Sequence, residues 1–283
     1  MKQRIITALI LAPLAIGGIF LLPLKFFMLF SAAIFLLASR EWAGFVSKTP
    51  STFVLYLFGL ILGATLLLIP VEHLWVNSEA NDYIFYGLIV AAIWWCISIV
   101  MVLTYPKSAS FWKQSKTLKC IFGLLTLLPF FWSLVILRSV EIHHNFFYGG
   151  QLLMFVFLLV WAADSGAYFT GKKFGKNKLA PNVSPGKTIE GFLGGLVSAM
   201  IVAVIGVFVF SIPSDDILLF LIASLITTVV SALGDLSESV FKREAGLKDS
   251  GNLLPGHGGI LDRIDSLTAA VPVFTLIYLF WLI

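Results

Sequence analysis

Residues 84–104 read IFYGLIVAAIWWCISIVMVLT and contain no charged side chain. An α-helix needs about 20 largely apolar residues to cross the hydrocarbon core of a bilayer. Inside lipid, such a helix pairs every backbone N–H and C=O group within its own segment. The stretch therefore predicts a transmembrane helix.

Eight further apolar stretches and the overall composition support the same fold class. Of the 283 residues, 59% are hydrophobic and 12% are charged, whereas a soluble domain carries roughly 25% charged residues. The mean hydropathy is +0.98. The predicted spans are residues 5–24, 26–46, 52–70, 84–104, 120–138, 151–170, 191–211, 216–234 and 266–283. We therefore predict an all-α fold, a polytopic transmembrane helical bundle of about nine spans, and exclude a water-soluble domain.

The distribution of Lys and Arg predicts the orientation, because the cytoplasmic loops of membrane proteins are enriched in both. With the N-terminus in the cytoplasm, 17 of the 19 basic residues fall in inner segments, and Lys25 and Arg138 fall outside. The outer loops hold acidic residues, at Glu72, Glu79, Asp82, Glu141, Asp215 and Asp216. We predict a multi-pass protein of the cell (inner or plasma) membrane with a cytoplasmic N-terminus.

Polar residues gather in the C-terminal half and predict a division of the chain. Residues 1–140 would form an N-terminal transmembrane bundle, and residues 141–283 a catalytic transmembrane region with cytoplasmic loops 171–190 and 235–265. Small residues four apart occur at Gly59/Gly63 and Gly191/Gly195. Such spacing is typical of close helix packing, either inside one bundle or across a homodimer, and both interpretations stay open.

Asp164 lies inside the sixth predicted span. A charged side chain near the centre of a membrane helix costs about 2.5–3.5 kcal/mol, and such residues are usually functional. The alternative is that the helix ends before Asp164 and leaves it in water.

A possible anion site follows at Ser184-Pro185-Gly186-Lys187-Thr188. Pro and Gly favour a tight turn, and Lys and Thr place donors beside exposed backbone N–H groups. The spacing differs from that of a Walker A loop.

The second polar segment runs from Gly234 to Asp265. If the eighth span continues as a helix through Lys242, then Asp235, Glu238 and Lys242 share one face. Gly246 is placed to end that helix, and the turn-rich run 255–259 could approach phosphate closely.

Acidic and basic residues are mixed within this segment. Carboxylates with waters and substrate phosphates suit Mg²⁺, while Lys and Arg bind the remaining phosphate oxygens. The mixture is what metal-dependent phosphoryl or nucleotidyl transfer requires. A salt-bridged surface loop in which Asp265 caps a helix is the alternative.

The run from Ser239 to Asp265, SVFKREAGLKDSGNLLPGHGGILDRID, resembles the signature of the phosphatidate cytidylyltransferases, also called CDP-diacylglycerol synthases. The stretch from Asp164 to Gly191 is also similar to that family, whose motif there usually reads S-P-K-K-T-x-E-G. This chain differs by having Gly186 in place of the first lysine and Ile189 where an aromatic residue is common. The resemblance is sharp over about the last 120 residues of the sequence.

The resemblance implies that CTP and phosphatidate react to give CDP-diacylglycerol and pyrophosphate, with Mg²⁺ as the cofactor. The acyl chains of this membrane lipid would lie among the apolar helices, the active site would face the cytoplasm, and no nucleic acid is expected as a partner. Within this reaction we predict Asp235 and Asp262 as the Mg²⁺ ligands. The predicted catalytic set is Asp235, Lys248, Asp249, Asp262 and Asp265. The predicted substrate-binding residues are Asp164, Ser184, Lys187, Thr188, Glu190, Ser239, Lys242, Arg243, His257 and Arg263.

Three other classes of protein would share part of this pattern. An ion-coupled transporter would also contain intramembrane acids, but its substrate site would lie near the membrane midplane between repeats. Most of the candidate acids of this chain instead gather at one face of the membrane. A lipid kinase would use the same phosphate chemistry and release a nucleoside diphosphate instead of pyrophosphate. A purely structural membrane protein has no need of the polar segment 235–265.

Overall fold

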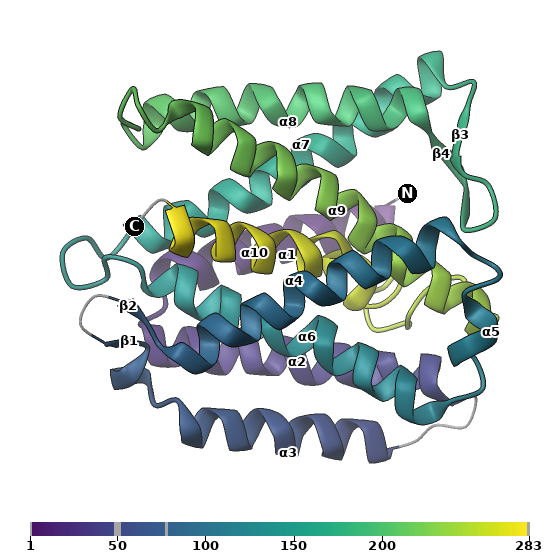
Figure 1. The fold of residues 1–283 in the computed structure, drawn as a ribbon, viewed down its shortest axis with the longest axis horizontal. Coiled ribbons are helices and arrows are strands. Elements are labelled where there is room, and N and C mark those ends of the chain that lie inside the picture. Colours follow the sequence, from purple (N-terminus) through teal and green to yellow (C-terminus); the bar gives the residue numbers. More distant parts are fainter. Residues whose placement is uncertain (1, 48–51, 77–78, 282–283) are drawn as a thin grey trace.

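The computed structural model describes residues 2–47, 52–76 and 79–281, and most of the chain forms long helices that lie side by side (Figure 1). The helices are α1 (Lys2–Leu21), α2 (Leu24–Val46), α3 (Thr52–Leu68), α4 (Asp82–Leu103), α5 (Ala109–Trp112), α6 (Lys116–Ser139), α7 (Tyr148–Phe174), α8 (Ile189–Val209), α9 (Ile217–Ala245) and α10 (Leu261–Trp281), with a 3-10 turn η1 at Val71–His73. Two short antiparallel pairs join β1 (Trp75–Val76) to β2 (Glu79–Ala80) and β3 (Lys178–Ala180) to β4 (Ser184–Thr188).

The helices account for the predicted spans. In the described part of the chain, seven of them are long and apolar enough to cross a membrane, namely α2, α4, α6, α7, α8, α9 and α10. The apolar parts described for α1 and α3, Leu9–Leu21 and Thr52–Leu68, are shorter. Each predicted span overlaps one helix, which confirms the all-α fold of a multi-pass membrane protein. The number of helices that cross, and the side on which the N-terminus lies, stay predictions.

The polar segments lie at one end of the bundle. The β3–β4 hairpin, α5 and the loop between α9 and α10 are at this end, and the β1–β2 pair and the C-terminal end of α10 are at the other (Figure 1). α9 continues to Ala245, beyond the predicted span, and Gly246 ends it with φ 72. This left-handed conformation carries no Cβ penalty in glycine. About half of the predicted loop 235–265 is therefore helical, and its irregular part is confined to residues 246–260.

Glycines bring α7 and α8 into close contact. A Cβ at Gly195 would lie 2.7 Å from the carbonyl oxygen of Ala163, and one at Gly191 would lie 2.9 Å from that of Ala167. The Gly191/Gly195 spacing thus serves packing within the chain. At Gly63, by contrast, a Cβ would meet no described atom within 4 Å.

Aromatic side chains join the two predicted parts of the chain into one core. The Trp42 ring of α2 lies 5.0 Å from the Phe241 ring of α9, and the Trp112 ring of α5 lies 4.9 Å from Phe241 (centroid distances). α10 also packs against α6 and α4. The division at residue 140 stays a prediction, because helices from both sides share this core.

Arg138 closes the other end of the bundle. Its side chain is 0% exposed. Nε donates to the carbonyl oxygen of Ile19 at 2.6 Å, and Nη1 donates to that of Phe146 at 3.0 Å. Nη2 lies 3.5 Å from the carbonyl oxygen of Leu22. The guanidinium therefore binds carbonyl groups at the end of α1 and in the α6–α7 connection, where no helical N–H can reach them.

We predict that Arg138→Met lowers the free energy of unfolding by about 3 kcal/mol, because it leaves buried carbonyl groups without a donor. Thermal unfolding of the purified protein in detergent measures the effect. Lys25→Met is the matched control, because Lys25 is 72% exposed in its ion pair with Glu72 and such surface pairs contribute little. Equal loss of stability in both variants would contradict this role for Arg138.

Candidate active site

The β3–β4 hairpin brings Lys187 to α9. The strands pair Lys178 with Thr188 and Ala180 with Ser184, so the chain turns back toward the bundle. The Nζ atom of Lys187 lies 2.6 Å from Oδ2 of Asp235, and the two side chains are 29% and 28% exposed. The two polar segments predicted from the sequence therefore meet in an ion pair that water and substrate can reach.

Three predicted substrate-binding residues hold this hairpin in place. Nε of Arg243 donates to the carbonyl oxygen of Val183 at 3.0 Å. The Glu190 carboxylate accepts from the backbone N–H groups of residues 176 and 177 and from Nδ2 of Asn177. The Thr188 hydroxyl caps α8 by accepting from the N–H of Gly191 at 3.1 Å. These contacts are structural, and contact of these side chains with substrate stays a prediction.

A pocket of about 470 Å³ opens between α7, α8, α9 and the hairpin. Its polar lining includes Asp164, Lys187, Thr188 and Asp235. The rest of its lining is mostly small or apolar and comes from helices, such as Ala163, Ala167, Gly195, Leu196 and Ala232. The pocket therefore joins an ion pair to an apolar interior, as a site for an amphipathic molecule would.

Asp164 belongs to the helix and not to a solvated loop, because α7 continues to Phe174. Its carboxylate is close enough to Asp235, Lys187 and Arg263 to interact with their charges. The structure thus places Asp164 beside the ion pair of the hairpin. Its predicted contact with substrate stays a prediction.

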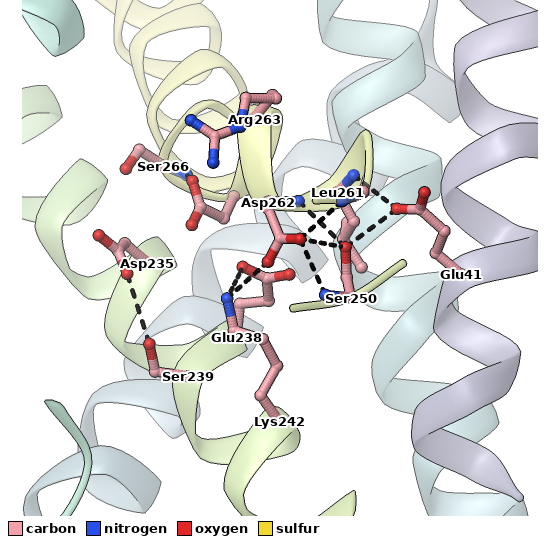
Figure 2. Close-up of polar contacts among 12 residues, drawn as sticks. Glu41, Asp235, Glu238, Ser239, Lys242, Ser250, Leu261, Asp262, Arg263 and Ser266 are labelled. Atoms are coloured by element: carbon pink, nitrogen blue, oxygen red, sulfur yellow. Dashed lines mark hydrogen bonds and ion pairs between the residues drawn. The ribbon is translucent and has the colours of Figure 1, made fainter. Parts of the chain in front are cut away.

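One face of α9 carries the acids and the lysine that the helical period predicted. The Ser239 hydroxyl is 3.4 Å from Oδ1 of Asp235, and Nζ of Lys242 is 3.0 Å from Oε2 of Glu238. The same Nζ lies 2.8 Å from Oδ1 of Asp262, at the start of α10. Figure 2 shows Lys242 linking the two helices through these carboxylates. The shared face predicted for Asp235, Glu238 and Lys242 is confirmed.

The loop between α9 and α10 closes around the Asp262 carboxylate. Oδ2 accepts from the N–H of Ser250 at 2.8 Å, from its hydroxyl at 2.9 Å and from the N–H of Gly259 at 2.8 Å. A Cβ at Gly258, where φ is +79, would lie 2.6 Å from that oxygen. The Asp262 side chain is 6% exposed. Asp262 is therefore an organising centre of the loop, less accessible than Asp235.

Two further carboxyl groups, those of Glu238 and Asp265, lie between Asp235 and Asp262. Asp265 is close enough to Asp235 and Glu238 for their charges to interact, and Asp265 and Glu238 line one small pocket. Oδ1 of Asp265 accepts from the N–H of Ser266 at 2.7 Å. Oε1 of Glu238 is buried, and the carboxyl groups of Glu238 and Asp265 are close enough to share a hydrogen bond. Buried carboxyl groups this close to one another require either a shared proton or nearby cations.

The remaining predicted residues lie in the loop between α9 and α10, at the start of α10 and at the start of β4. Lys248 and Asp249 are exposed in the loop, and Ser184 is half-buried at the start of β4. Nε of Arg263 donates to the carbonyl oxygen of His257 at 3.1 Å. Nδ1 of His257 is buried and has no partner among the described residues. The proposed roles of all five stay predictions.

The donor set fits a metal ion that arrives with substrate. In the described part of the chain, no three His, Cys, Asp or Glu side chains form a metal cage. Mg²⁺ does not need one, because one or two carboxylates with waters and substrate phosphates suffice. Asp235 lines the open pocket and meets this requirement. Asp262 is less available to a metal ion, because its Oδ2 already accepts three hydrogen bonds. Its predicted role as a Mg²⁺ ligand stays a prediction.

Glu41 is a site residue that sequence analysis did not identify. It lies in α2 within a predicted span, and its carboxylate contacts the loop that holds Asp262 (Figure 2). The sequence held one signal for it, because an acid inside an apolar span is usually functional.

Comparisons with known proteins match nearly the whole chain to the family that the sequence motifs resemble. Residues 2–281 match the model of the Cytidylyltransferase family. The chain is 42% identical to a Haemophilus influenzae protein named phosphatidate cytidylyltransferase, over 99% of each chain. It is 43% identical to a Pseudomonas aeruginosa protein of that name, over 97% of this chain and 95% of the other. A Bacillus subtilis protein of that name is 35% identical over 96% and 95%. The chain is therefore a nucleotidyltransferase and belongs to the cytidylyltransferase family.

Proposed function

We propose that this enzyme transfers the cytidylyl group of CTP to phosphatidate, giving CDP-diacylglycerol and pyrophosphate. The Lys187–Asp235 ion pair at the polar end of a partly apolar pocket carries the proposal. A lysine can bind a polyanion, a carboxylate can bind the cation that accompanies it, and the apolar lining suits the acyl chains of a lipid. The names of the relatives support the choice of substrates.

In the proposed reaction, a phosphate oxygen of phosphatidate attacks the α-phosphorus of CTP. A new P–O bond forms, the bond from the α-phosphorus to the bridging oxygen breaks, and pyrophosphate leaves with its electron pair. No protein nucleophile takes part. The chain lowers the barrier by holding two polyanions together and offsetting their charge.

The charges of the site residues support the following proposed roles. Lys187 would exchange its contact with Asp235 for a substrate phosphate, which charge-assisted hydrogen bonds favour. Asp235 would then be free to hold Mg²⁺, with Asp164 and Asp265 as neighbouring carboxyl groups. When bound, Mg²⁺ would offset the charge of the phosphate oxygens. Lys242 and Arg263 would offset the remaining charge, and Asp262 would hold Lys242 in position.

The proposal places the site at the cytoplasmic side of the inner membrane. CTP is water-soluble and phosphatidate is anchored in lipid, so the polar end of the bundle must face the compartment that holds the nucleotide. The excess of Lys and Arg in the segments predicted to be inner supports that orientation. A homodimer stays a prediction, and the uncovered side of Gly63 is the surface on which it would be sought.

The direct test supplies purified protein with phosphatidate, Mg²⁺ and each nucleoside triphosphate in turn, and measures pyrophosphate and the lipid product. We expect CDP-diacylglycerol and pyrophosphate in equal amounts, with CTP as the preferred nucleotide. A nucleoside diphosphate product would indicate a lipid kinase. Uptake of a solute into proteoliposomes without nucleotide, and with no lipid product, would indicate a transporter.

We predict that Asp235→Asn lowers turnover at least about a hundredfold with little change in thermal stability, because it removes charge that acts on the transition state. Asp262→Asn should lower turnover comparably and also lower the unfolding temperature, because that carboxylate organises the loop. Initial rates and thermal unfolding measure both effects. Asp215→Asn, at an exposed site next to α9, is the matched control. Near-normal turnover of Asp235→Asn would contradict the assignment of Asp235 as a metal ligand, and near-normal turnover of Asp262→Asn would contradict the positioning role of Asp262.

We also predict that Lys187→Gln lowers kcat/KM by about tenfold to a hundredfold, because a neutral side chain cannot offset phosphate charge. Lys178→Gln, on the paired strand of the same hairpin and exposed, should change kcat/KM little. Steady-state kinetics with varied CTP and phosphatidate measure both. Equal losses in the two variants would indicate a general effect of positive charge on the hairpin.

A further inference from the structure

Glu41 connects the N-terminal part of the chain to the loop of the proposed active site. Its side chain is 9% exposed. Oε1 accepts from the N–H of Ile260 at 2.9 Å, and Oε2 accepts from the N–H of Leu261 at 2.8 Å. These N–H groups open α10 and have no acceptor within their own helix. A carboxylate from another helix therefore caps α10, where the positive end of the helix dipole favours it.

A single hydroxyl group links Glu41 to Asp262. Oγ of Ser250 lies 3.0 Å from Oε2 of Glu41 and 2.9 Å from Oδ2 of Asp262. The hydroxyl has one proton, so it can donate to only one of the two carboxylates at a time. In Figure 2, Glu41 and Asp235 lie on opposite sides of Asp262. The contacts thus run from Glu41 through Ser250 to Asp262, and from there to Lys242.

The loop is shaped to fit around the Glu41 carboxylate. A Cβ at Gly251 would lie 2.7 Å from Oε1 of Glu41, and a Cβ at Gly259 would also overlap the carboxylate. Contacts this short would displace either the loop or the Glu41 carboxylate, and so would break the cap. Glycine at both positions therefore lets the backbone of residues 250–261 approach an acid located more than 200 positions earlier in the sequence.

We propose that Glu41 is a positioning residue for the transfer reaction: it holds Ser250 and the start of α10 so that Asp262 and Lys242 keep their places. This inference rests on the proposed function. Glu41 does not line the pocket that contains Lys187 and Asp235, so it acts through other residues.

The attachment of α2 to α9 does not depend on this carboxylate. Trp42 and Phe45 of α2 pack on Phe241 with centroid distances of 5.0 and 6.3 Å, and the indole N–H of Trp42 donates to the carbonyl oxygen of Lys119 at 2.8 Å. Loss of the charge at Glu41 should therefore leave the bundle assembled. The defect is expected in the loop and at the N-terminus of α10.

The first test replaces Glu41 with Gln, which keeps the shape but turns one acceptor into a donor facing a buried N–H group. We expect kcat to fall at least about tenfold while KM for CTP and for phosphatidate changes less than about threefold, as for a group that acts on the transition state. Hydrogen exchange at residues 250–262 should become faster, with the other helices unchanged. Glu72→Gln, an identical change at an exposed ion pair, should alter neither quantity.

A double-mutant cycle with Ser250→Ala distinguishes positioning from a general loss of stability. Ser250→Ala should also lower kcat, and the double variant should be slowed no more than about twofold beyond Glu41→Gln alone, because coupled residues are not additive. Multiplied effects, normal kcat in Glu41→Gln, or faster exchange throughout the bundle would each overturn the proposal. If the unmodified enzyme makes no CDP-diacylglycerol, the proposed function fails, and the exchange measurement still tests whether Glu41 holds the loop.

Discussion

Charge compensation at the end of an apolar bundle is the constraint on which this site depends. A carboxylate removed from water is strongly destabilising unless a cation or several N–H groups face it. The carboxylates of Asp235 and Asp262 meet this need in different ways. Asp235 is partly exposed and pairs with Lys187, whereas Asp262 is nearly buried and takes Lys242 together with backbone donors. The Lys187–Asp235 pair remains accessible to water, and the Lys242–Asp262 pair holds the structure around it.

The same constraint explains why distant segments converge. Lys187 reaches Asp235 because Arg243 and Glu190 hold the hairpin by its backbone. The loop before α10 reaches Asp262 because glycines at 258 and 259 leave room for carboxylates. Glycines between α7 and α8 play a similar part, since the close approach of these helices forms one wall of the pocket. Small residues thus determine the geometry of the site as much as charged ones do.

Local rules accounted for much of this architecture. The spans were predictable because backbone pairing in lipid is satisfied within each helix. The shared face of Asp235, Glu238 and Lys242 followed from the helical period, and the end of α9 at Gly246 followed from its conformational freedom. The Lys187–Asp235 pair and the cap that Glu41 places on α10 were not predictable from spacing, because each joins segments that are far apart in the sequence: β4 to α9, and α2 to α10. The contacts of Glu190 and Arg243 with the backbone of the hairpin were hidden for the same reason. The Thr188 cap of α8 is a local contact, of a kind that a sequence can indicate.

The arrangement also explains how one site can serve a lipid and a nucleotide. A pocket lined only by charge would exclude acyl chains, and one lined only by apolar side chains would exclude a triphosphate. Here Lys187 and Asp235 stand at the polar end, while Leu196, Ala232 and Gly195 extend the lining into the bundle. The reacting phosphates would then meet where the dielectric changes from lipid to water. At that boundary, fixed charges act more strongly than they would in solvent, so the position of the ion pair matters as much as its chemistry.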